Sequence, residues 1–235
     1  MGIRVALPDL AHWQAQVKCQ AGCPVSTDAG RYVQLIAEGH LEEAYLVARA
    51  PNPLASVCGR VCAAPCEDAC RRGTIDAPVS IRALKRHATE QFGVESMHPE
   101  TQDRLFEIGT SEGNRYSGHL PLRFHRHAPE PVQQNRRRVA VIGSGPAGLA
   151  AAHDLVQLNY RVTIFEAAAE PGGMMRFGIP EYRLPRALLG AEIDRIISLG
   201  AELRLSTPLS AGFGLAQLRS SGFEAIFSLT KAFSR

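Results

Sequence analysis

Six cysteines near the start of the chain are the first residues whose types and spacing indicate chemistry. Cys19 and Cys23 precede a proline, and residues 58–70 hold four more at steps of four, namely Cys58, Cys62, Cys66 and Cys70. Thiols at this density in a cytoplasmic protein favour metal or redox chemistry over disulfides, because that compartment keeps thiols reduced. Thiolates are the common ligands of iron–sulfur clusters, and a Cys-Pro step beside a ligand recurs in ferredoxin-like sites.

Two other interpretations of these cysteines stay open. Zinc binds four thiolates readily, but the Cys-x2-Cys pairs of its usual sites are missing here. Buried, inert thiols are the third interpretation. Steps of four would align the thiols on one helical face, whereas Gly59 and Pro65 indicate that the run is partly loop, so that several sulfur atoms can converge. The pattern therefore favours an iron–sulfur site.

A glycine-rich turn is the second stretch with chemical potential. It follows an apolar, β-branched run at residues 139–142 and precedes an alanine-rich helix, which is the order strand, turn, helix. In the GxGxxG spacing the first glycine permits a tight turn, the second admits a pyrophosphate, and the third lets the helix pack on the strand. The helix N-terminus then supplies amides to an anion. We predict a diphosphate cradle formed by Gly143, Ser144, Gly145, Pro146, Ala147 and Gly148.

The next strand strengthens the prediction of a dinucleotide site. Residues 161–165 are predicted to form it, and Glu166 ends it, 18 residues after Gly148. From that position a carboxylate accepts hydrogen bonds from both ribose hydroxyls and disfavours a 2′-phosphate. Gly172 and Gly173 follow soon afterwards, and a glycine pair there lets the chain turn back over a bound diphosphate.

These motifs together resemble a known family. The segments GSGPAGLAAA, FEAAAEPGGMM and FGIPEYRLP are similar to the FAD-binding half of the glutamate synthase small subunit and to the N-terminal region of dihydropyrimidine dehydrogenase, and CGRVC…PCE..C resembles the iron–sulfur domain of that family. The match runs in order over residues 19–227. The resemblance implies FAD on the glycine-rich turn, with Glu166 at the ribose and Gly173, Met174 and Arg183 lining the cofactor. Arg183 would contact phosphate or flavin.

The cysteine pattern departs from the family in one respect. Members commonly hold two [4Fe–4S] clusters, and two further ligands of the family pattern fall on Ala11 and Gln14 here. One cluster would therefore keep only Cys19 and Cys70, which are too few to bind it.

The resemblance assigns the second cluster to three cysteines and one residue of the following helix. The cysteines are Cys23, Cys62 and Cys66, and the helix position is occupied by Lys85, whose ammonium is a poor ligand. Cys58 and Cys70 are near in sequence and can complete the set. We therefore expect one cluster instead of two.

Helices are predicted around the cysteines. Residues 27–50 give one or two helices, capped by Thr27 or Asp28 and broken at Gly39. The apolar face of the first is predicted to consist of Val33, Ile36 and Ala37. Residues 80–93 give another helix, with Ile81, Leu84 and Ala88 inward, and its solvated face is predicted to hold Lys85, Arg86 and His87.

The second half of the chain alternates strands and helices, which predicts a parallel α/β sheet. After the first two strands come a helix at 186–199, a strand at 202–205, a short helix near 213–220 and a strand at 225–227. We therefore expect an α-helical Cys-rich iron–sulfur domain at residues 1–93, a linker at 94–136, and an incomplete α/β Rossmann-like FAD-binding domain at 137–235.

Bulk properties exclude several classes of protein. The chain has 235 residues, 45% hydrophobic content and a formal net charge of +3, with Lys and Arg scattered along it, so nucleic-acid binding has no support. No apolar run approaches the length of about 18 residues that a membrane span needs, and no signal peptide is recognisable. We expect a cytoplasmic protein.

The expected function follows from the resemblance. Family members pass hydride from NAD(P)H to a flavin, and electrons then reach a cluster and a partner subunit, which is an electron acceptor or a catalytic protein. No second GxGxxG follows the first, so we expect the NAD(P)H domain to be missing and this chain alone to show no NAD(P)H-dependent activity. No catalytic side chain is required, because the cofactors carry the chemistry. The alternative is a non-catalytic cofactor-binding module or a truncated gene product.

Overall fold

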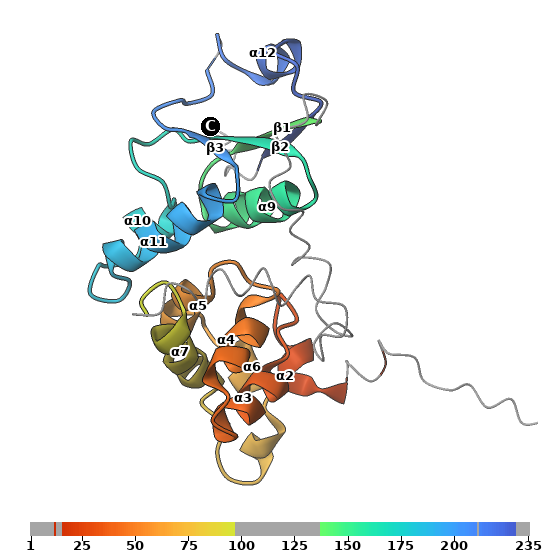
Figure 1. Ribbon diagram of the computed structural model, residues 1–235, viewed down its shortest axis with the longest axis vertical. Helices are drawn as coiled ribbons and strands as arrows, with labels where there is room; N and C mark the ends of the chain where they lie inside the picture. Colours follow the sequence, from red (N-terminus) through yellow and green to blue (C-terminus); the bar gives the residue numbers. More distant parts are fainter. Residues whose placement is uncertain (1–11, 13–15, 97–136, 211, 229–235) are drawn as a thin grey trace, which may run out of the picture.

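The chain folds into a helical N-terminal half and a parallel-sheet C-terminal half, drawn red to yellow and green to blue in Figure 1. The structure is a computed structural model, and it describes residues 12, 16–96, 137–210 and 212–228. Most of the expected linker, together with Ala11 and Gln14, lies outside the described residues.

Short helices make up the described N-terminal half. They are α2 (Lys18–Ala21), α3 (Ala29–Ala37), α4 (Leu41–Arg49), α5 (Ala55–Val61), α6 (Pro65–Asp68), the 3₁₀ helix η1 (Arg71–Thr74) and α7 (Ile81–Phe92). Asp28 caps α3, because its Oδ1 accepts a hydrogen bond from the Arg31 amide at 3.0 Å. Gly39, with φ of +83°, separates α3 from α4. Both sequence predictions, the cap and the break, are confirmed.

The buried face of α3 differs from the predicted one. Tyr32 and Leu35 are its large buried side chains, whereas Val33 and Ile36 are half-buried and Ala37 is exposed. The tyrosine turns inward because its hydroxyl donates a hydrogen bond to a main-chain carbonyl of α7 at 3.0 Å. A buried phenol needs such a partner. The buried face of α3 is therefore shifted by about one residue from the predicted face.

The C-terminal half contains a four-stranded parallel sheet. Its strands are β1 (Arg138–Ile142), β2 (Arg161–Phe165), β3 (Glu202–Arg204) and β4 (Ala225–Ser228), in the order β3-β2-β1-β4. The connecting helices are α9 (Pro146–Gln157), α10 (Met174–Phe177), α11 (Arg186–Ile197) and α12 (Leu215–Ser220). This is the strand order of a Rossmann-like half, so the predicted fold class is confirmed.

Alternating side chains of β1 and β2 pack on opposite faces of the sheet. Val141 and Ile164 belong to the core beneath α9 and α11, whereas Ile142 and Phe165 pack with Leu218 of α12. Figure 1 shows α9 and α11 on the side of the sheet that faces the helical half, and α12 on the other side. The uninterrupted apolar run in β1 is therefore explained by burial on both faces.

The two halves of the chain share one hydrophobic core. Leu54 and Val57, at the start of α5, belong to the same buried cluster as Leu189 and Ile193 of α11. The helix that carries Cys58 is therefore packed directly on the dinucleotide half. In the described part of the chain, no helix has the length and apolarity that crossing a membrane requires.

Candidate cofactor sites

The glycine-rich turn has the geometry that its spacing predicts. Gly143 has φ of +94°, and its amide donates a hydrogen bond to the Phe165 carbonyl at 2.8 Å. A Cβ on Gly148 would lie 2.0 Å from the Gly143 carbonyl oxygen, so no side chain fits where α9 approaches β1. A Cβ on Gly145, in contrast, would meet nothing within 4 Å. The turn is tight at both outer glycines and open at the middle one, where the protein backbone could approach a pyrophosphate.

The N-terminus of α9 faces this open position. Gly145 is its N-cap and provides no side-chain hydrogen bond, and Pro146 occupies the first turn. Proline lacks an amide hydrogen and suits that position. The 12-residue helix thus directs its positive dipole end at the open side of the turn, which is the arrangement that binds a diphosphate.

Glu166 secures the turn from the end of β2. Its Oε2 accepts hydrogen bonds from the backbone amide and the hydroxyl of Ser144, the amide at 2.8 Å, and its Oε1 accepts one from the Ala168 amide at 2.9 Å. Burial alone would raise the pKa of Glu166, but these hydrogen bonds outweigh it and the pKa is lowered. The carboxylate is therefore charged at neutral pH.

The glycine pair folds back onto the turn, as predicted. The Gly172 amide donates to the Ser144 carbonyl at 3.1 Å, and a Cβ on Gly173 would lie 2.8 Å from the Cα of Gly145. Both glycines have positive φ, +121° and +51°. Met174 begins α10 directly after the pair and is exposed, and Arg183 is exposed beyond it.

The six cysteines lie in and beside the short helices of the other half. Cys19 lies in α2, Cys58 in α5 and Cys66 in α6, and all six thiols are free and partly exposed. The run is part helix and part loop, as Gly59 and Pro65 predicted. No three described His, Cys, Asp or Glu residues are grouped so that they could share one metal ion. A four-iron cluster bonds each thiolate to a different iron, so its thiols surround a volume and need not converge on a point.

The electrostatic couplings divide the thiols into two groups. Burial raises the pKa of Cys66, and the nearby thiols of Cys23 and Cys62 raise it further. Burial also raises the pKa of Cys19, to which Cys70 adds. The thiol that acts on Cys19 is thus Cys70, and those that act on Cys66 are Cys23 and Cys62. This is the division that the family resemblance implies.

Cys58 joins the second group. Burial raises the pKa of its thiol, and the neighbouring Cys62 contributes in the same direction. Cys70 instead lies at the surface, where hydrogen bonds with the backbone of Val79, Arg72 and Gly73 lower the pKa of its thiol. Of the two candidates for completing the set, Cys58 is the one coupled to it.

Lys85 corrects the prediction of a solvated face on α7. Arg86 and His87 are exposed as expected, but Lys85 is buried, and its Nζ lies 5.7 Å from the centroid of the Tyr32 ring. Burial alone would raise the pKa of Cys23, but hydrogen bonds with Thr27 and the charge of Lys85 lower it. The lysine turns inward because it lies on the face of α7 that packs on the thiol-bearing elements.

The first turn of α7 holds the cysteine run in place. The Arg82 guanidinium donates to the Cys62 carbonyl at 2.8 Å, and the Arg82 amide donates to Glu67 Oε1 at 2.7 Å. Glu67 follows Cys66 directly, so α7 is hydrogen-bonded to the cysteine run at Cys62 and next to Cys66. These contacts arise from the fold and have no local sequence signal.

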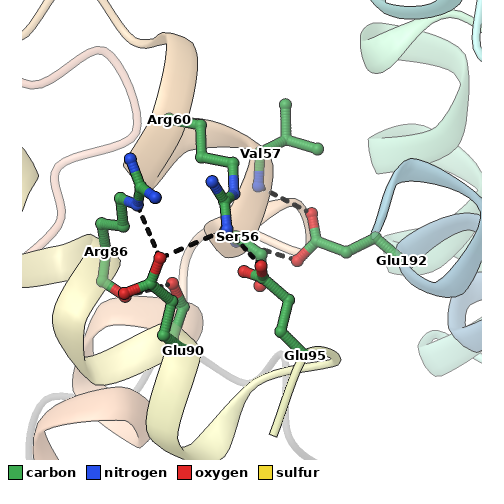
Figure 2. Close-up of polar contacts among 8 residues, drawn as sticks. Ser56, Val57, Arg60, Arg86, Glu90, Glu95 and Glu192 are labelled. Carbon is green, nitrogen blue, oxygen red and sulfur yellow. Dashed lines mark hydrogen bonds and ion pairs between the residues drawn. The ribbon is translucent and has the colours of Figure 1, made fainter. Parts of the chain in front are cut away.

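Two sets of charged contacts fix α5, as Figure 2 shows. Glu192 of α11 accepts hydrogen bonds from the amides of Ser56 and Val57 at 2.9 and 3.1 Å, which caps the helix from the other half of the chain. Arg60 pairs with Glu95 and, at 3.2 Å, with Glu90 of α7.

Sequence reasoning missed Glu192. The available signal was a carboxylate within the apolar face of α11, whose buried residues are Leu188, Leu189, Ile193 and Ile196. Burial raises the pKa of Glu192, although the two amides oppose this. Such a buried acid is retained where it has specific donors to bind.

Comparisons with known proteins match both halves. Residues 14–97 match the family described as dihydropyrimidine dehydrogenase domain II, 4Fe-4S cluster, and residues 141–187 match the NAD(P)-binding Rossmann-like domain. The helical half is therefore an iron–sulfur domain, and a partial Rossmann-like domain follows it.

Three relatives illustrate the similarity. The chain is 37% identical over 213 residues to the NADP(+)-dependent formate dehydrogenase subunit beta of Moorella thermoacetica, covering 90% of this chain and 29% of that one. It is 33% identical over 204 residues to the NAD-dependent dihydropyrimidine dehydrogenase subunit PreT of Escherichia coli (86% and 42%). It is 33% identical over 187 residues to Glutamate synthase [NADH] of Schizosaccharomyces pombe (79% and 8%).

The resemblance to dihydropyrimidine dehydrogenase and glutamate synthase is thereby confirmed, and these relatives are oxidoreductases or their subunits. The chain spans less than half of the length of each of the three.

Proposed function

We propose that this relative of the dihydropyrimidine dehydrogenase and glutamate synthase proteins binds one [4Fe–4S] cluster and one FAD, and that it relays electrons between them. The observation that carries the proposal is the direct packing of α5, which bears Cys58, on α11 of the dinucleotide half. This packing supports a short, fixed path between the two cofactor sites.

The cluster ligands we propose are Cys66, the thiols of Cys23 and Cys62 that act on it, and Cys58, on which Cys62 acts. Four free thiols from three short segments suit a cluster with four corners. Cys19 and Cys70 form a separate pair, and two thiols are too few to hold a second cluster. The α7 helix orients the set through Arg82, which bonds the Cys62 carbonyl.

For FAD, the open position at Gly145 and the α9 N-terminus would bind the diphosphate, and Glu166 would bind the adenosine ribose. Gly173 lies against Gly145 and would close over the diphosphate from the other side, with Met174 and Arg183 further along the cofactor. Ser144 and Ala168 already donate to this carboxylate, so a ribose hydroxyl would share its oxygens with them.

When bound, the flavin and the cluster supply the conversion of a two-electron donor into single-electron steps. The residues of the chain bind and orient these groups, and Glu192 keeps α5 fixed on α11. In the proposed relay NAD(P)H would donate the hydride, and a partner subunit would accept the electrons. Formate dehydrogenase subunit beta and PreT are named as subunits, which supports such a partner.

A second candidate ligand for the glycine-rich turn is NAD(P) itself. The match of residues 141–187 to a family described as NAD(P)-binding favours it. A carboxylate at Glu166 disfavours the 2′-phosphate of NADP, so NADH is the nicotinamide cofactor that fits better.

The test is anaerobic purification followed by iron, acid-labile sulfide and flavin analysis. We expect about four iron and four sulfide per chain, and quenching of flavin fluorescence on titration with FAD but no binding of NADH by calorimetry. Stoichiometric zinc without sulfide overturns the cluster proposal. Tight binding of NADH without FAD binding replaces the flavin with the nicotinamide cofactor.

A further inference from the structure

Ser144 is a buried hydroxyl residue within the glycine-rich turn. It belongs to the predicted diphosphate cradle, yet 0% of the residue is exposed, so its side chain lies inside the protein. Its backbone amide is also engaged, because it donates a hydrogen bond to Oε2 of Glu166 at 2.8 Å. Ser144 therefore serves the site through its protein partners and not through a phosphate contact.

The hydroxyl of Ser144 connects two other parts of the site. A charged carboxylate only accepts hydrogen bonds, so the hydroxyl proton is donated to Oε2 of Glu166. A backbone amide only donates, so the same hydroxyl oxygen accepts a hydrogen bond from the Gly172 amide, at 3.1 Å. One buried side chain thus connects the end of β2 with the glycine pair, and its two neighbours fix the direction of its single proton.

The main chain around Glu166 is held independently of this hydroxyl. The Glu166 amide donates to the Arg204 carbonyl, and the Glu166 carbonyl accepts from the Thr207 amide, both at 2.8 Å. The side chain is held differently, because Oε2 is bound by the amide and the hydroxyl of Ser144, and Oε1 by the Ala168 amide at 2.9 Å. Loss of the hydroxyl would therefore loosen the carboxylate without moving the strand that carries it.

The glycine pair also has supports besides this hydroxyl. A Cβ on Gly173 would lie 2.8 Å from the Cα of Gly145, and a Cβ on Gly172 would lie 3.2 Å from Leu189 of α11. The Gly172 amide donates to the Ser144 carbonyl as well, at 3.1 Å. Packing and the main chain thus hold the pair in place, so the hydroxyl should act chiefly on Glu166.

We propose that Ser144 is a positioning residue, whose hydroxyl fixes the Glu166 carboxylate where it accepts a hydrogen bond from the 2′-hydroxyl of an adenine nucleotide. Ser144 thereby sets the preference of the site for a ribose that carries this hydroxyl. The inference rests on the proposed function, and it applies to FAD and NADH alike, because both contain adenosine diphosphate. A hydrogen bond to a charged group is strong only in a suitable geometry, and a carboxylate that rotates freely loses entropy when it adopts that geometry.

The test compares the binding of ADP and 2′-deoxy-ADP, which differ only in the hydroxyl that Glu166 would bind. Calorimetry gives both affinities for the purified full chain and for its Ser144→Ala, Glu166→Gln and doubly substituted variants. Ser220→Ala is the matched control, because it removes a serine hydroxyl from an exposed position on α12. FAD is titrated in parallel by flavin fluorescence, and circular dichroism checks that each variant is folded.

We expect the unmodified chain and Ser220→Ala to bind ADP at least tenfold more tightly than 2′-deoxy-ADP, which is the effect of one hydrogen bond to a charged group. In Ser144→Ala this ratio should fall to about threefold or less, while the affinity for 2′-deoxy-ADP stays within about threefold of the original. Glu166→Gln should lose the preference too. The double variant should lose nothing more, because the hydroxyl acts through the carboxylate.

The results that contradict the inference are distinct from those that contradict the proposed function. If the unmodified chain binds neither FAD nor ADP, the proposed function fails and the inference with it. If FAD and ADP bind, but ADP and 2′-deoxy-ADP bind equally well, only the inference fails. It fails alone as well if Ser144→Ala weakens the binding of both nucleotides by the same factor, because the hydroxyl is then merely structural.

A second variant covers the case in which Ser144→Ala does not fold. Ser144→Cys then replaces it, because a thiol is similar in size to the hydroxyl but is a weak hydrogen-bond donor. The same fall in the ratio of affinities is expected. If neither variant folds, the hydroxyl serves the stability of the turn instead of the position of Glu166, and the inference is overturned.

Discussion

The carboxylate of Glu192 accepts a hydrogen bond from the backbone amide of Ser56 at 2.9 Å, across a sequence separation of 136 residues. Its second oxygen binds the next amide, that of Val57, so one side chain of the Rossmann-like half caps a helix of the iron–sulfur half. A helix of seven residues has few other means of satisfying its first amides.

Glu192→Ala is expected to destabilise the whole chain. It leaves two buried amides without an acceptor, at a cost of about 2 to 4 kcal/mol in the free energy of unfolding. Asp194→Ala is the matched control, because it removes a carboxylate from an exposed position on the same helix. Guanidinium denaturation followed by circular dichroism measures both. Equal stability of the two variants would show that the cap contributes nothing.

Gly145→Ala is expected to separate cofactor binding from folding. Its Cβ meets no protein atom within 4 Å, so the melting temperature should stay unchanged, while a methyl group at the diphosphate position should weaken FAD binding at least tenfold. Gly190→Ala, equally open but on α11, should affect neither. Titration of flavin fluorescence gives the affinities. Full affinity in Gly145→Ala would move the diphosphate site elsewhere.

Cys66→Ser and Cys70→Ser are expected to differ in iron content. Cys66 belongs to the set coupled through Cys23 and Cys62, so its loss should remove most of the iron and sulfide. Cys70 lies at the surface with Cys19 as its neighbour, and its replacement should leave about four iron per chain. Equal iron loss in the two variants would contradict the ligand set proposed above.

His153 is expected to make stability fall between about pH 6.5 and pH 4. Burial lowers the pKa of this histidine to about 4, against about 6.5 in an unfolded chain. Over that window the unfolded state binds more protons, so the free energy of unfolding decreases as the pH falls, by up to about 3 kcal/mol.

His153→Gln is the comparison variant for this pH dependence. The glutamine retains an acceptor near Gln157, whose Nε2 lies 2.7 Å from His153 Nε2. Its unfolding free energy, measured in urea across the same pH window, should fall less steeply. Parallel curves for the two proteins would rule the histidine out as the cause.

Local patterns predicted the elements well because their signals are short-range. Strand β2 ends at Phe165, directly before Glu166, as predicted. The glycine spacing predicted both the tight turn and the close approach of α9 to β1 at Gly148. These features depend on neighbouring residues and on backbone geometry alone, which a sequence displays directly.

The orientation of polar side chains depends on elements distant in sequence and was predicted less well. Lys85 is predicted on the solvated face of its helix with Arg86 and His87, yet it is buried against the ring of Tyr32 on α3. Tyr32 is buried because its hydroxyl donates a hydrogen bond to the carbonyl of Ile81, which lies 49 residues later in the sequence. Both outcomes were decided by tertiary partners that no local pattern reveals.

The shared core of Leu54, Val57 and α11 has a consequence for synthesis on the ribosome. At about 5 to 20 residues per second, the partners of Val57 on α11 emerge roughly 7 to 27 s after it does. During that interval the nascent helix with Cys58 lacks both its apolar neighbours and its Glu192 cap. Stable folding of this helix is therefore expected only after the sheet half has been translated.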